Sequence, residues 1–223
     1  MERNIVITAD GSQSIQVPSL NIMYHSKHGA LQESMHVFIQ HGVQALLPFQ
    51  KPCMVAVEMG FGTGLNCQLL HAFATQHKIK IRYTGIEAYP LAPAEWQQLA
   101  YDALLPQGTV TSQQLHALPA DIWCEIDEYF AVYKIHQPLQ EADLPTEIDL
   151  VLYDAFAPAA QPFLWEQPIF ERWYSQMAQG GLLTTYCSKG DVRRALLAAG
   201  FIAKKLPGPP GKREMLQAFK PYI

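Results

Sequence analysis

Short apolar runs alternate with amphipathic helical segments through most of this chain, and no other feature constrains its fold as strongly. Residues 53–57, 80–86 and 148–153 have the length and composition of buried strands, whereas residues 64–76 carry apolar side chains at helical spacing. Strands that alternate with helices build a mostly parallel sheet covered by helices on both faces. The sequence therefore predicts an α/β fold of the Rossmann-like type.

The remaining segments extend this alternation. A hairpin is expected over 4–17 and a helix around 31–39, whereas residues 102–128 show no clear pattern. The other expected elements are helices over 93–101, 166–178 and 190–199 and strands over 129–135 and 182–187, the last after a break at Gly180-Gly181. The final strands, 201–206 and 214–219, are joined only by a Pro- and Gly-rich loop, so they should be antiparallel neighbours.

Length and composition limit the class of protein. The chain has 223 residues, 49% of them hydrophobic, which suits one compact core better than two. We expect a single domain over 1–223, with an N-terminal hairpin and helix extension (1–50) and a Rossmann-like core (51–223). No apolar run approaches the roughly 18 residues of a membrane span, and no signal peptide is recognisable. The 4 Cys form no C-x-x-C pair and the 8 His form no metal motif, so we expect a cytoplasmic protein without a metal site.

A glycine-rich turn joins the strand at 53–57 to the helix at 64–76. Its sequence is Glu58-Met59-Gly60-Phe61-Gly62-Thr63-Gly64-Leu65-Asn66, and its glycines let backbone amides approach a ligand closely. A dinucleotide fingerprint requires a small residue at the position of Leu65, and no P-loop sequence occurs. An acidic residue just before the glycines suits a cationic ligand such as S-adenosylmethionine better than a pyrophosphate. The alternative is a tight strand–helix turn without a ligand.

A second acidic residue, Glu87, follows the strand at 80–86. It lies about 20 residues beyond the last glycine, the offset at which a carboxylate meets ribose hydroxyls in nucleotide-binding βαβ units. Together with the glycine-rich turn, Glu87 indicates a nucleoside-containing cofactor. The alternative is a solvated residue at the end of a strand.

The strand at 148–153 brings a third carboxylate, Asp154, to the same edge of the sheet. A carboxylate in this position can orient an amine and stabilise a positive charge, and aromatic residues after it can stack on a base. The segment continues as Ala155-Phe156-Ala157-Pro158, with Pro162 and Trp165 further on. Alternatively, Asp154 caps the loop or the next helix, and the aromatic residues belong to the core.

Charge is distributed unevenly along the chain. The net charge is −4, yet eight of the 16 Lys and Arg lie within 189–223, beside only two acidic residues. A basic face of this kind attracts phosphate backbones. A solvated helix and a basic chain end have the same composition, so charge alone leaves both interpretations open.

Taken together, these motifs resemble the MnmC methyltransferase family over nearly the whole chain. The matching segments are Tyr24-His25-Ser26, Gly29-Ala30-Leu31-Gln32-Glu33-Ser34, the glycine-rich turn, Glu87-Ala88-Tyr89-Pro90-Leu91, Asp154-Ala155-Phe156-Ala157-Pro158 with Pro162 and Trp165, Ser188 with Val192-Arg193-Arg194, Ala199-Gly200-Phe201 and Gly211-Lys212-Arg213-Glu214-Met215-Leu216. The resemblance implies a Rossmann-like class I S-adenosylmethionine-dependent methyltransferase with an antiparallel C-terminal strand. It also implies methylation of the aminomethyl group on the wobble uridine of certain tRNAs.

The resemblance further implies a role for each candidate residue. Cofactor binding is expected for Glu58, Gly60, Gly62, Gly64, Asn66 and Glu87. Asp154 is the expected catalytic residue, with Phe156 and Pro158 beside the uridine, whereas Arg193, Arg194, Lys212 and Arg213 are expected to hold the anticodon stem-loop of the tRNA. In many bacteria this domain looks fused to a flavin-dependent oxidoreductase. Here we expect the methyl-transfer half alone, with such an oxidoreductase as a separate partner.

The chain departs from the family pattern after its third strand. The family usually has a Gly-Asp pair whose acid lies near the adenine, where this chain has Ile135-His136-Gln137-Pro138. Glu33 lies in a matching segment and is expected to be an exposed helix acid, with contact to the substrate as the alternative. The rival functions are methylation of a small-molecule amine, RNA binding without catalysis and nicotinamide-dependent oxidoreduction, the last opposed by Leu65.

Overall fold

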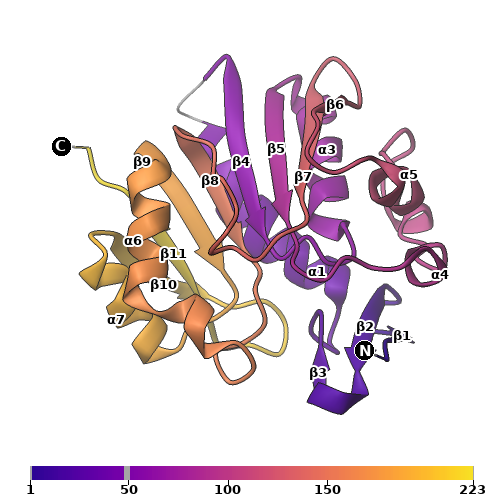
Figure 1. Cartoon of the computed structure of the whole chain (residues 1–223), viewed down its shortest axis with the longest axis horizontal. Coiled ribbons are helices and arrows are strands. Elements are labelled where there is room, and N and C mark those ends of the chain that lie inside the picture. The colour runs from indigo at the N-terminus through magenta and orange to yellow at the C-terminus, as the bar shows by residue number, and fades with distance from the viewer. Residues whose placement is uncertain (1, 48–50, 223) are drawn as a thin grey trace.

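The computed structural model describes residues 2–47 and 51–222. A large sheet of eight strands and a small sheet of three form its framework, and helices lie on both sides of the large sheet (Figure 1). The order of the large sheet is β10-β11-β9-β8-β4-β5-β7-β6. Its strands are β4 (Cys53–Met59), β5 (Lys80–Ile86), β6 (Cys124–Glu125), β7 (Phe130–Ile135), β8 (Ile148–Tyr153), β9 (Met177–Thr185), β10 (Ile202–Pro207) and β11 (Glu214–Phe219).

Most neighbouring strands of the large sheet are parallel. β4 pairs in parallel with β5 and β8, β5 pairs with β7, and β8 pairs with β9. β11 is antiparallel to both β9 and β10, and the short β6 is antiparallel to β7. The predicted α/β class, with a mostly parallel sheet and an antiparallel C-terminal strand, is therefore confirmed.

Alternate side chains of the central strands enter two separate cores. Ala56 and Leu150 belong to the core under α3 (Leu65–His77) and the N-terminal helical segment. That segment consists of α1 (Ala30–Ser34), a π-helical stretch (Met35–Val43) and α2 (Gln44–Leu46). Val57 and Val151 belong to the opposite core, under α6 (Gln167–Gln176) and α7 (Gly190–Ala198). In the part of the chain that the structure describes, no helix has the length and apolarity needed to cross a bilayer.

The small sheet is formed by β1 (Asn4–Ile7), β2 (Gln13–Val17) and β3 (Ile22–Met23), all antiparallel, and the hairpin predicted over 4–17 is confirmed. It lies below the lower ends of β4 and β5 in Figure 1. Gln13 fixes it to the segment after α4 (Pro93–Trp96), because its backbone carbonyl accepts from the Tyr101 hydroxyl at 2.8 Å and its side chain accepts from the Ala100 amide at 2.6 Å.

Two predicted boundaries are wrong. α4 ends at Trp96 rather than at residue 101, and the Ala100 amide bonds to Gln13 instead of continuing a helix. β9 already begins at Met177, so the helix before it ends at Gln176 rather than at residue 178. The predicted break at Gly180-Gly181 is an irregularity inside β9, where the pairing with β8 shifts register and Gly180 has a φ of 77°.

The segment 102–128, which shows no clear pattern in the sequence, contains the short helix α5 (Ser112–Ala117). The Thr111 hydroxyl accepts from the Gln114 amide at 3.1 Å, and the Gln114 side chain accepts from the Thr111 amide at 2.9 Å. This reciprocal pair is a capping box, so the Thr-x-x-Gln spacing is a local signal for the start of α5.

The order of strands in the large sheet reverses between β4 and β8. The chain adds β5 and β7 on one side of β4, and then β8 and β9 on the other. Ligands of such sheets bind beyond the carboxyl ends of the strands at this switch point. The loops that follow Met59 and Tyr153, the last residues of β4 and β8, are therefore where a site is expected.

Candidate active site

A cavity of about 290 Å³ lies at the switch point, beside the carboxyl ends of β4, β5 and β8 and the small N-terminal sheet. Residues predicted for the site that line this cavity are Glu58, Gly60, Gly62, Asn66, Glu87, Asp154 and Phe156. Its wall also contains Arg3, Leu20, Tyr24, His25, Tyr89 and Phe163. The described lining does not include Gly64, Pro158, Arg193, Arg194, Lys212 or Arg213.

The glycine-rich turn lets two loops approach each other closely. Gly60 has a φ of 92°, and a Cβ atom there would lie 2.7 Å from the backbone oxygen of Asp154. The Asp154 amide in turn donates to the carbonyl of Met59 at 2.9 Å. Gly64 caps the N-terminus of α3 with a φ of 77° and faces the Phe61 ring rather than the cavity.

Asn66 connects the two carboxylates at the centre of the site. Its side-chain nitrogen donates to Glu58 Oε1 at 2.7 Å and to Asp154 Oδ2 at 2.9 Å. The Tyr83 hydroxyl donates to the other oxygen of Glu58, whose side chain is almost fully buried. Two acidic groups thus share one amide in a site that is closed on the Glu58 side.

Burial changes the acidity of both carboxyl groups. It raises the pKa of Glu58 well above the ordinary value, and the charge of Asp154 raises it further. Burial also raises the pKa of Asp154, as does the charge of Glu33, whereas the hydrogen bond from Asn66 and the charge of Lys212 lower it. A cation placed between these groups would compensate their charges, so the pair favours a positively charged ligand.

An unpartnered polar atom also points to a ligand. Asn66 Oδ1 is buried at the cavity and has no hydrogen-bond partner among the described residues. Buried polar atoms in native proteins are normally bonded. A donor such as an ammonium group would satisfy it, so the residues present fit S-adenosylmethionine.

Glu87 is held by the backbone at both of its carboxylate oxygens. Oε2 accepts from the Gly62 amide at 3.0 Å and Oε1 from the Tyr89 amide at 2.9 Å. Each oxygen retains a lone pair, so Glu87 can still accept from a ligand hydroxyl. The carboxylate therefore joins the glycine-rich turn to the loop after β5.

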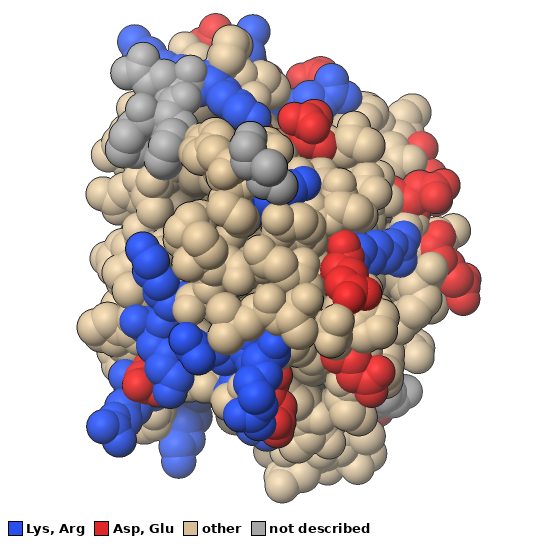
Figure 2. All heavy atoms as spheres, turned by 90° about the vertical axis from the view of Figure 1, so that its left-hand side faces the viewer, with Lys and Arg blue, Asp and Glu red and all other residues tan. Residues whose placement is uncertain are grey.

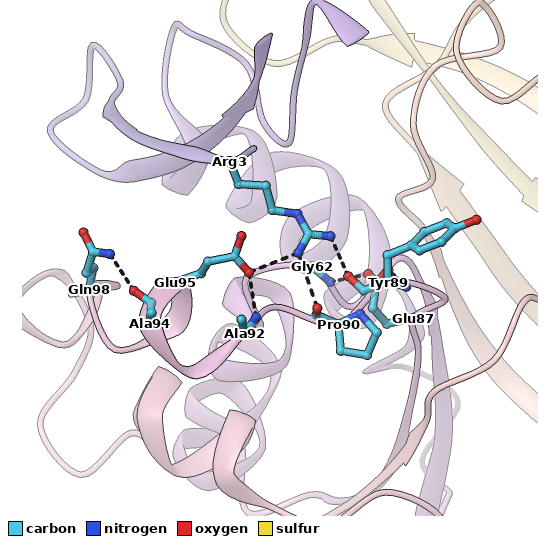
Figure 3. Close-up of polar contacts among 9 residues, drawn as sticks. All are labelled: Arg3, Gly62, Glu87, Tyr89, Pro90, Ala92, Ala94, Glu95 and Gln98. Carbon is cyan, nitrogen blue, oxygen red and sulfur yellow. Dashed lines mark hydrogen bonds and ion pairs between the residues drawn. The ribbon is translucent and has the colours of Figure 1, made fainter. Parts of the chain in front are cut away.

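Arg3 of the N-terminal segment holds the loop after β5 in place (Figure 3). Its guanidinium donates to the carbonyls of Tyr89 at 2.7 Å and Pro90 at 3.3 Å, and it pairs with Glu95 at 3.1 Å. Glu95 also accepts from the Ala92 amide at 2.6 Å. Sequence reasoning missed Arg3, because it is a single cation in no motif and its partners lie far along the chain.

The loop after β8 carries Asp154 and an aromatic cluster. The Phe156 ring lies edge-on to Tyr24, with ring centroids 5.1 Å apart. The Phe156 carbonyl accepts from the Trp165 indole at 2.8 Å, and its amide donates to the Gln161 side chain at 3.2 Å. Pro158 lies on the same loop and is half-buried. The loop is thus fixed by side chains that follow it closely in sequence.

Glu33 is not an exposed helix acid, and that expectation is wrong. Only 6% of the residue is exposed, and its Oε2 accepts from the Ser26 amide at 2.7 Å. Its other oxygen forms an ion pair with Lys212, whose ammonium lies 3.7 Å from the centre of the Tyr186 ring. The helical pattern of 31–39 does not reveal this burial, because the partner comes from the far end of the chain.

The other basic candidates lie on the surface. Arg194 and Arg213 are exposed and Arg193 is half-buried, and Arg194 also pairs with Asp191. Figure 2 shows Lys and Arg gathering in the lower part of the face to which α7 and β10 belong. This surface holds cations that a polyanion can reach, whereas Lys212 is largely engaged by Glu33.

The edge of β7 provides no carboxylate toward the cavity. The Ile135 carbonyl accepts from the Glu87 amide at 2.9 Å, and His136 is exposed and outside the described lining. Within residues 2–47 and 51–222, no three His, Cys, Asp or Glu side chains gather as metal ligands would.

A glycine-rich turn, two carboxylates at the carboxyl edge of a parallel sheet and a cavity between them define a site of the methyltransferase class. Residues 94–221 match the family described as S-adenosyl-L-methionine-dependent methyltransferase. This match covers more than half of the chain, and the chain belongs to this family. Its cofactor is accordingly S-adenosylmethionine.

The similarity to MnmC that the motifs indicate is also confirmed. The chain is 31% identical over 220 residues to the "tRNA 5-methylaminomethyl-2-thiouridine biosynthesis bifunctional protein MnmC" of Stutzerimonas stutzeri, covering 87% of this chain and 31% of the relative. It is 29% identical over 211 residues to the protein of that name from Methylobacillus flagellatus, covering 87% and 32%. The chain thus spans about a third of the length of these relatives.

Solved structures show the same fold. The crystal structure of MNMC2 from Aquifex aeolicus matches with a TM-score of 0.79 at 22% identity, covering 100% of this chain and 73% of that one. A probable spermidine synthase from Corynebacterium glutamicum matches with a TM-score of 0.55 at 18% identity, covering 97% and 76%. These likenesses establish the Rossmann-like architecture.

Proposed function

We propose that this protein methylates the aminomethyl nitrogen on the wobble uridine of tRNA, converting 5-aminomethyl-2-thiouridine to 5-methylaminomethyl-2-thiouridine. The observation that carries the proposal is the shared amide of Asn66, which holds Asp154 beside the buried Glu58 in one cavity. The relatives named for 5-methylaminomethyl-2-thiouridine biosynthesis support the choice of substrate.

The cofactor side of the cavity is formed by the glycine-rich turn and Glu87. S-adenosylmethionine supplies an electrophilic methyl group on a sulfonium. Glu58 and Asn66 would hold its cationic end, Gly60 and Gly62 would leave room for its methionine part, and Glu87 would accept from its ribose hydroxyls; all five residues line the cavity. Gly64 contributes indirectly, by allowing the turn into α3.

Asp154 receives and orients the amine. An alkylamine has a pKa near that of lysine, roughly 10.4, so it enters mostly as an ammonium, which the carboxylate attracts. Attack requires the free lone pair, so a proton moves from the amine to Asp154, whose raised pKa favours acceptance. The N–C bond then forms as the C–S bond breaks and its electron pair stays on sulfur. Positive charge develops on nitrogen beside the site's acidic groups.

The rim of the cavity suits a nucleobase better than a free amine. Three large apolar residues that line the cavity are at least half exposed to solvent. They are Leu20 (51%), Tyr89 (64%) and Phe163 (50%). Large apolar side chains around a cavity mouth provide stacking surfaces for unstacked bases. Phe156 lines the cavity and is proposed to stack on the uridine, with Pro158 on the same loop.

The basic surface of α7 and the β10–β11 loop supports an RNA substrate. Arg193, Arg194 and Arg213 are proposed to contact the phosphates of the anticodon stem-loop, with Lys212 beside them. A separate flavin-dependent oxidoreductase is proposed to supply the aminomethyl substrate, in line with the bifunctional character of the named relatives. The reaction is proposed to occur in the cytoplasm, where tRNA matures.

The direct test is mass spectrometry of nucleosides in tRNA from cells that lack this protein. We expect 5-aminomethyl-2-thiouridine to accumulate and its methylated product to disappear, and both changes should be reversed by the wild-type gene but not by Asp154→Ala. A parallel assay with purified protein compares tRNA with free small amines. Methylation of free amines but not of tRNA would instead establish the small-molecule alternative.

A further inference from the structure

An ion pair between Glu33 and Lys212 lies outside the cavity lining, behind the loop after β8. This loop carries Asp154 and is called the catalytic loop below. We propose that this pair supports the loop after β8 and sets the charge around the Asp154 carboxyl group, with Glu33 as the anion and Lys212 as the cation. The inference rests on the proposed function only in calling Asp154 catalytic. Neither residue touches the amine, so both are positioning residues.

Glu33 is tied to the wall of the cavity by the backbone. Its Oε2 accepts from the Ser26 amide at 2.7 Å, and the neighbouring residue His25 lines the cavity together with Asp154. The side chain of Glu33 is only 7% exposed. A carboxylate so deeply buried keeps its charge only with a partner, and Lys212 is that partner.

Lys212 is connected to the catalytic loop from the other side. Its ammonium lies 3.7 Å from the centre of the Tyr186 ring, and the Tyr186 hydroxyl donates to the carbonyl of Ala155 at 2.8 Å. Ala155 directly follows Asp154. Lys212, in the loop between β10 and β11, therefore contacts Tyr186, the residue that anchors the catalytic loop.

The charged and polar groups around Asp154 come from several elements that form the cavity or lie behind the loop after β8. They are Arg3 and Tyr24 of the N-terminal segment, His25 before α1, Glu33 of α1, Glu58 of β4, Asn66 of α3, Glu87 after β5, Tyr186 after β9 and Lys212 of the β10–β11 loop. Burial lowers the pKa of His25 to about 4, so this ring is neutral near pH 7. This set contains two cations: Arg3 is paired with Glu95, and Lys212 is paired with Glu33.

The location of the pair argues against a purely structural role. A buried ion pair adds little net stability, because desolvation of both charges offsets their attraction. Burial leaves the charge of Asp154 poorly screened, so nearby charges act on it strongly. Three carboxylates line the cavity, those of Glu58, Glu87 and Asp154. The positive charge of Lys212 behind the loop allows Asp154 to ionise when the amine arrives. The negative charge of Glu33 limits this effect, so that Asp154 can still accept a proton.

The test follows the Asp154 carboxyl directly, by carbon-13 NMR titration of protein labelled at aspartate, with Asp154→Asn to assign the signal. Lys212→Met should move the titration midpoint of Asp154 upward by about half a pH unit or more, because it removes a cation. Glu33→Gln should move it downward by a similar amount. The double variant should return near the wild type, and Lys212→Arg should leave the midpoint in place.

A matched control lies on the same hairpin. Lys205 and Glu214 form a more exposed ion pair at 2.7 Å, and Lys205→Met or Glu214→Gln should leave the titration of Asp154 unchanged. If Glu33→Gln alone fails to fold, Lys212→Met and the double variant, in which neither residue is charged, still test the proposal. Shifts in the same direction for both single variants, or no shift, would overturn it.

The outcome separates this inference from the proposed function. Opposite shifts of the Asp154 titration in a protein that does not methylate tRNA would leave the positioning pair intact and refute the proposed substrate. Methylation of tRNA by the wild type with an unmoved titration in the variants would refute the pair alone. In the active enzyme, the acid limb of kcat against pH should follow the same opposite shifts.

Discussion

The side-chain nitrogen of Asn66 donates to both Glu58 and Asp154, at 2.7 and 2.9 Å, so one amide group holds an acidic residue on the cofactor side and another on the substrate side. Glu58 is also held by the hydroxyl of Tyr83, and Asp154 by its backbone bond to Met59. Binding of the donor and binding of the acceptor therefore depend on the same group.

Replacing Asn66 with Leu should impair both halves of the site. The change removes the Asn66 donor from both Glu58 and Asp154, and hydrogen bonds to charged groups contribute about 1.5–3 kcal/mol each. We expect S-adenosylmethionine affinity and turnover each to fall by about 10-fold or more, as measured by calorimetry and by methyl transfer at saturating donor. Gln98→Leu, on an exposed loop, is the control. Unchanged cofactor affinity in Asn66→Leu would contradict the assignment of Asn66.

Gly60→Ala should displace the catalytic loop. The new methyl group would lie 2.7 Å from the Asp154 carbonyl, in addition to the strain of a φ of 92°. Gly108→Ala is a matched control, because Gly108 has a φ of 89° and nothing within 4 Å of the added atom. Both variants should lose about 1 kcal/mol of stability to backbone strain. Only Gly60→Ala should also lose cofactor binding, and equal binding in the two variants would show that the contact is unimportant.

The stability of the ligand-free protein should depend on pH through Asp154. Burial raises the pKa of Asp154 in the folded state, so the folded protein keeps this proton where the unfolded chain has released it. The stabilising contribution is full below the unfolded pKa of roughly 3.9 and is lost as the pH rises through the raised folded value. Between pH 5 and 8, the Tm of the wild type should therefore fall relative to that of Asp154→Asn.

The exposed Asp143 provides the comparison for this titration. Asp143→Asn removes a solvent-exposed carboxyl group and serves as the control variant in the same Tm series. Affinity for the cationic cofactor should rise over the same range, because Glu58 and Asp154 ionise more easily beside a cation. A Tm difference between the wild type and Asp154→Asn that stays constant with pH would show that the folded environment does not perturb Asp154.

Arg3→Met should weaken cofactor binding without unfolding the protein. Arg3 holds the carbonyls of Tyr89 and Pro90, and Tyr89 in turn positions Glu87. Loss of the guanidinium should loosen this loop and raise the Kd of S-adenosylmethionine several-fold, measured by calorimetry. Arg82→Met, which removes a surface cation stacked on Trp123, should leave the Kd unchanged. Equal affinities in the wild type and Arg3→Met would mean that the loop holds its shape unaided.

Binding of tRNA should weaken steeply with salt, through the basic surface. Each phosphate contact adds about 0.7–0.9 to the slope of log K against log salt. Arg193→Ala, Arg194→Ala and Arg213→Ala should each reduce the slope by about that amount while leaving cofactor affinity unchanged. Lys80→Ala, at the amino end of β5, is the control. A slope near zero for the wild type would exclude this surface as the RNA site.

Sequence reasoning located the parts of the site that lie directly after strands. Glu58, Glu87 and Asp154 come at the ends of β4, β5 and β8, and the ends of parallel strands converge, so their proximity follows from the strand pattern alone. The bonds from the Asn66 amide to two of these carboxylates could not be predicted, because they depend on where the first turn of α3 lies relative to the ends of β4 and β8.

The contacts that escaped prediction join distant segments. Arg3 meets the loop after β5, and Glu33 meets Lys212, 179 residues away. Local periodicity predicts which face of a helix is apolar, but not which far segment covers a polar residue on it. The early start of β9 was missed for a different reason. Gly180-Gly181 is typical of a turn, but in this protein β9 continues through it and its pairing with β8 shifts register there.

There is no space for even one methyl group between Gly60 and the Asp154 carbonyl. The turn after β4, on the side of the methyl donor, and the loop after β8, on the side of the acceptor, therefore form a single unit. An enzyme redesigned for a different nucleophile by exchanging the segment after β8 would have to inherit the matching turn after β4. A chimaera that takes these two segments from different parents would form the same strands but hold the methyl donor and the nucleophile too far apart to react.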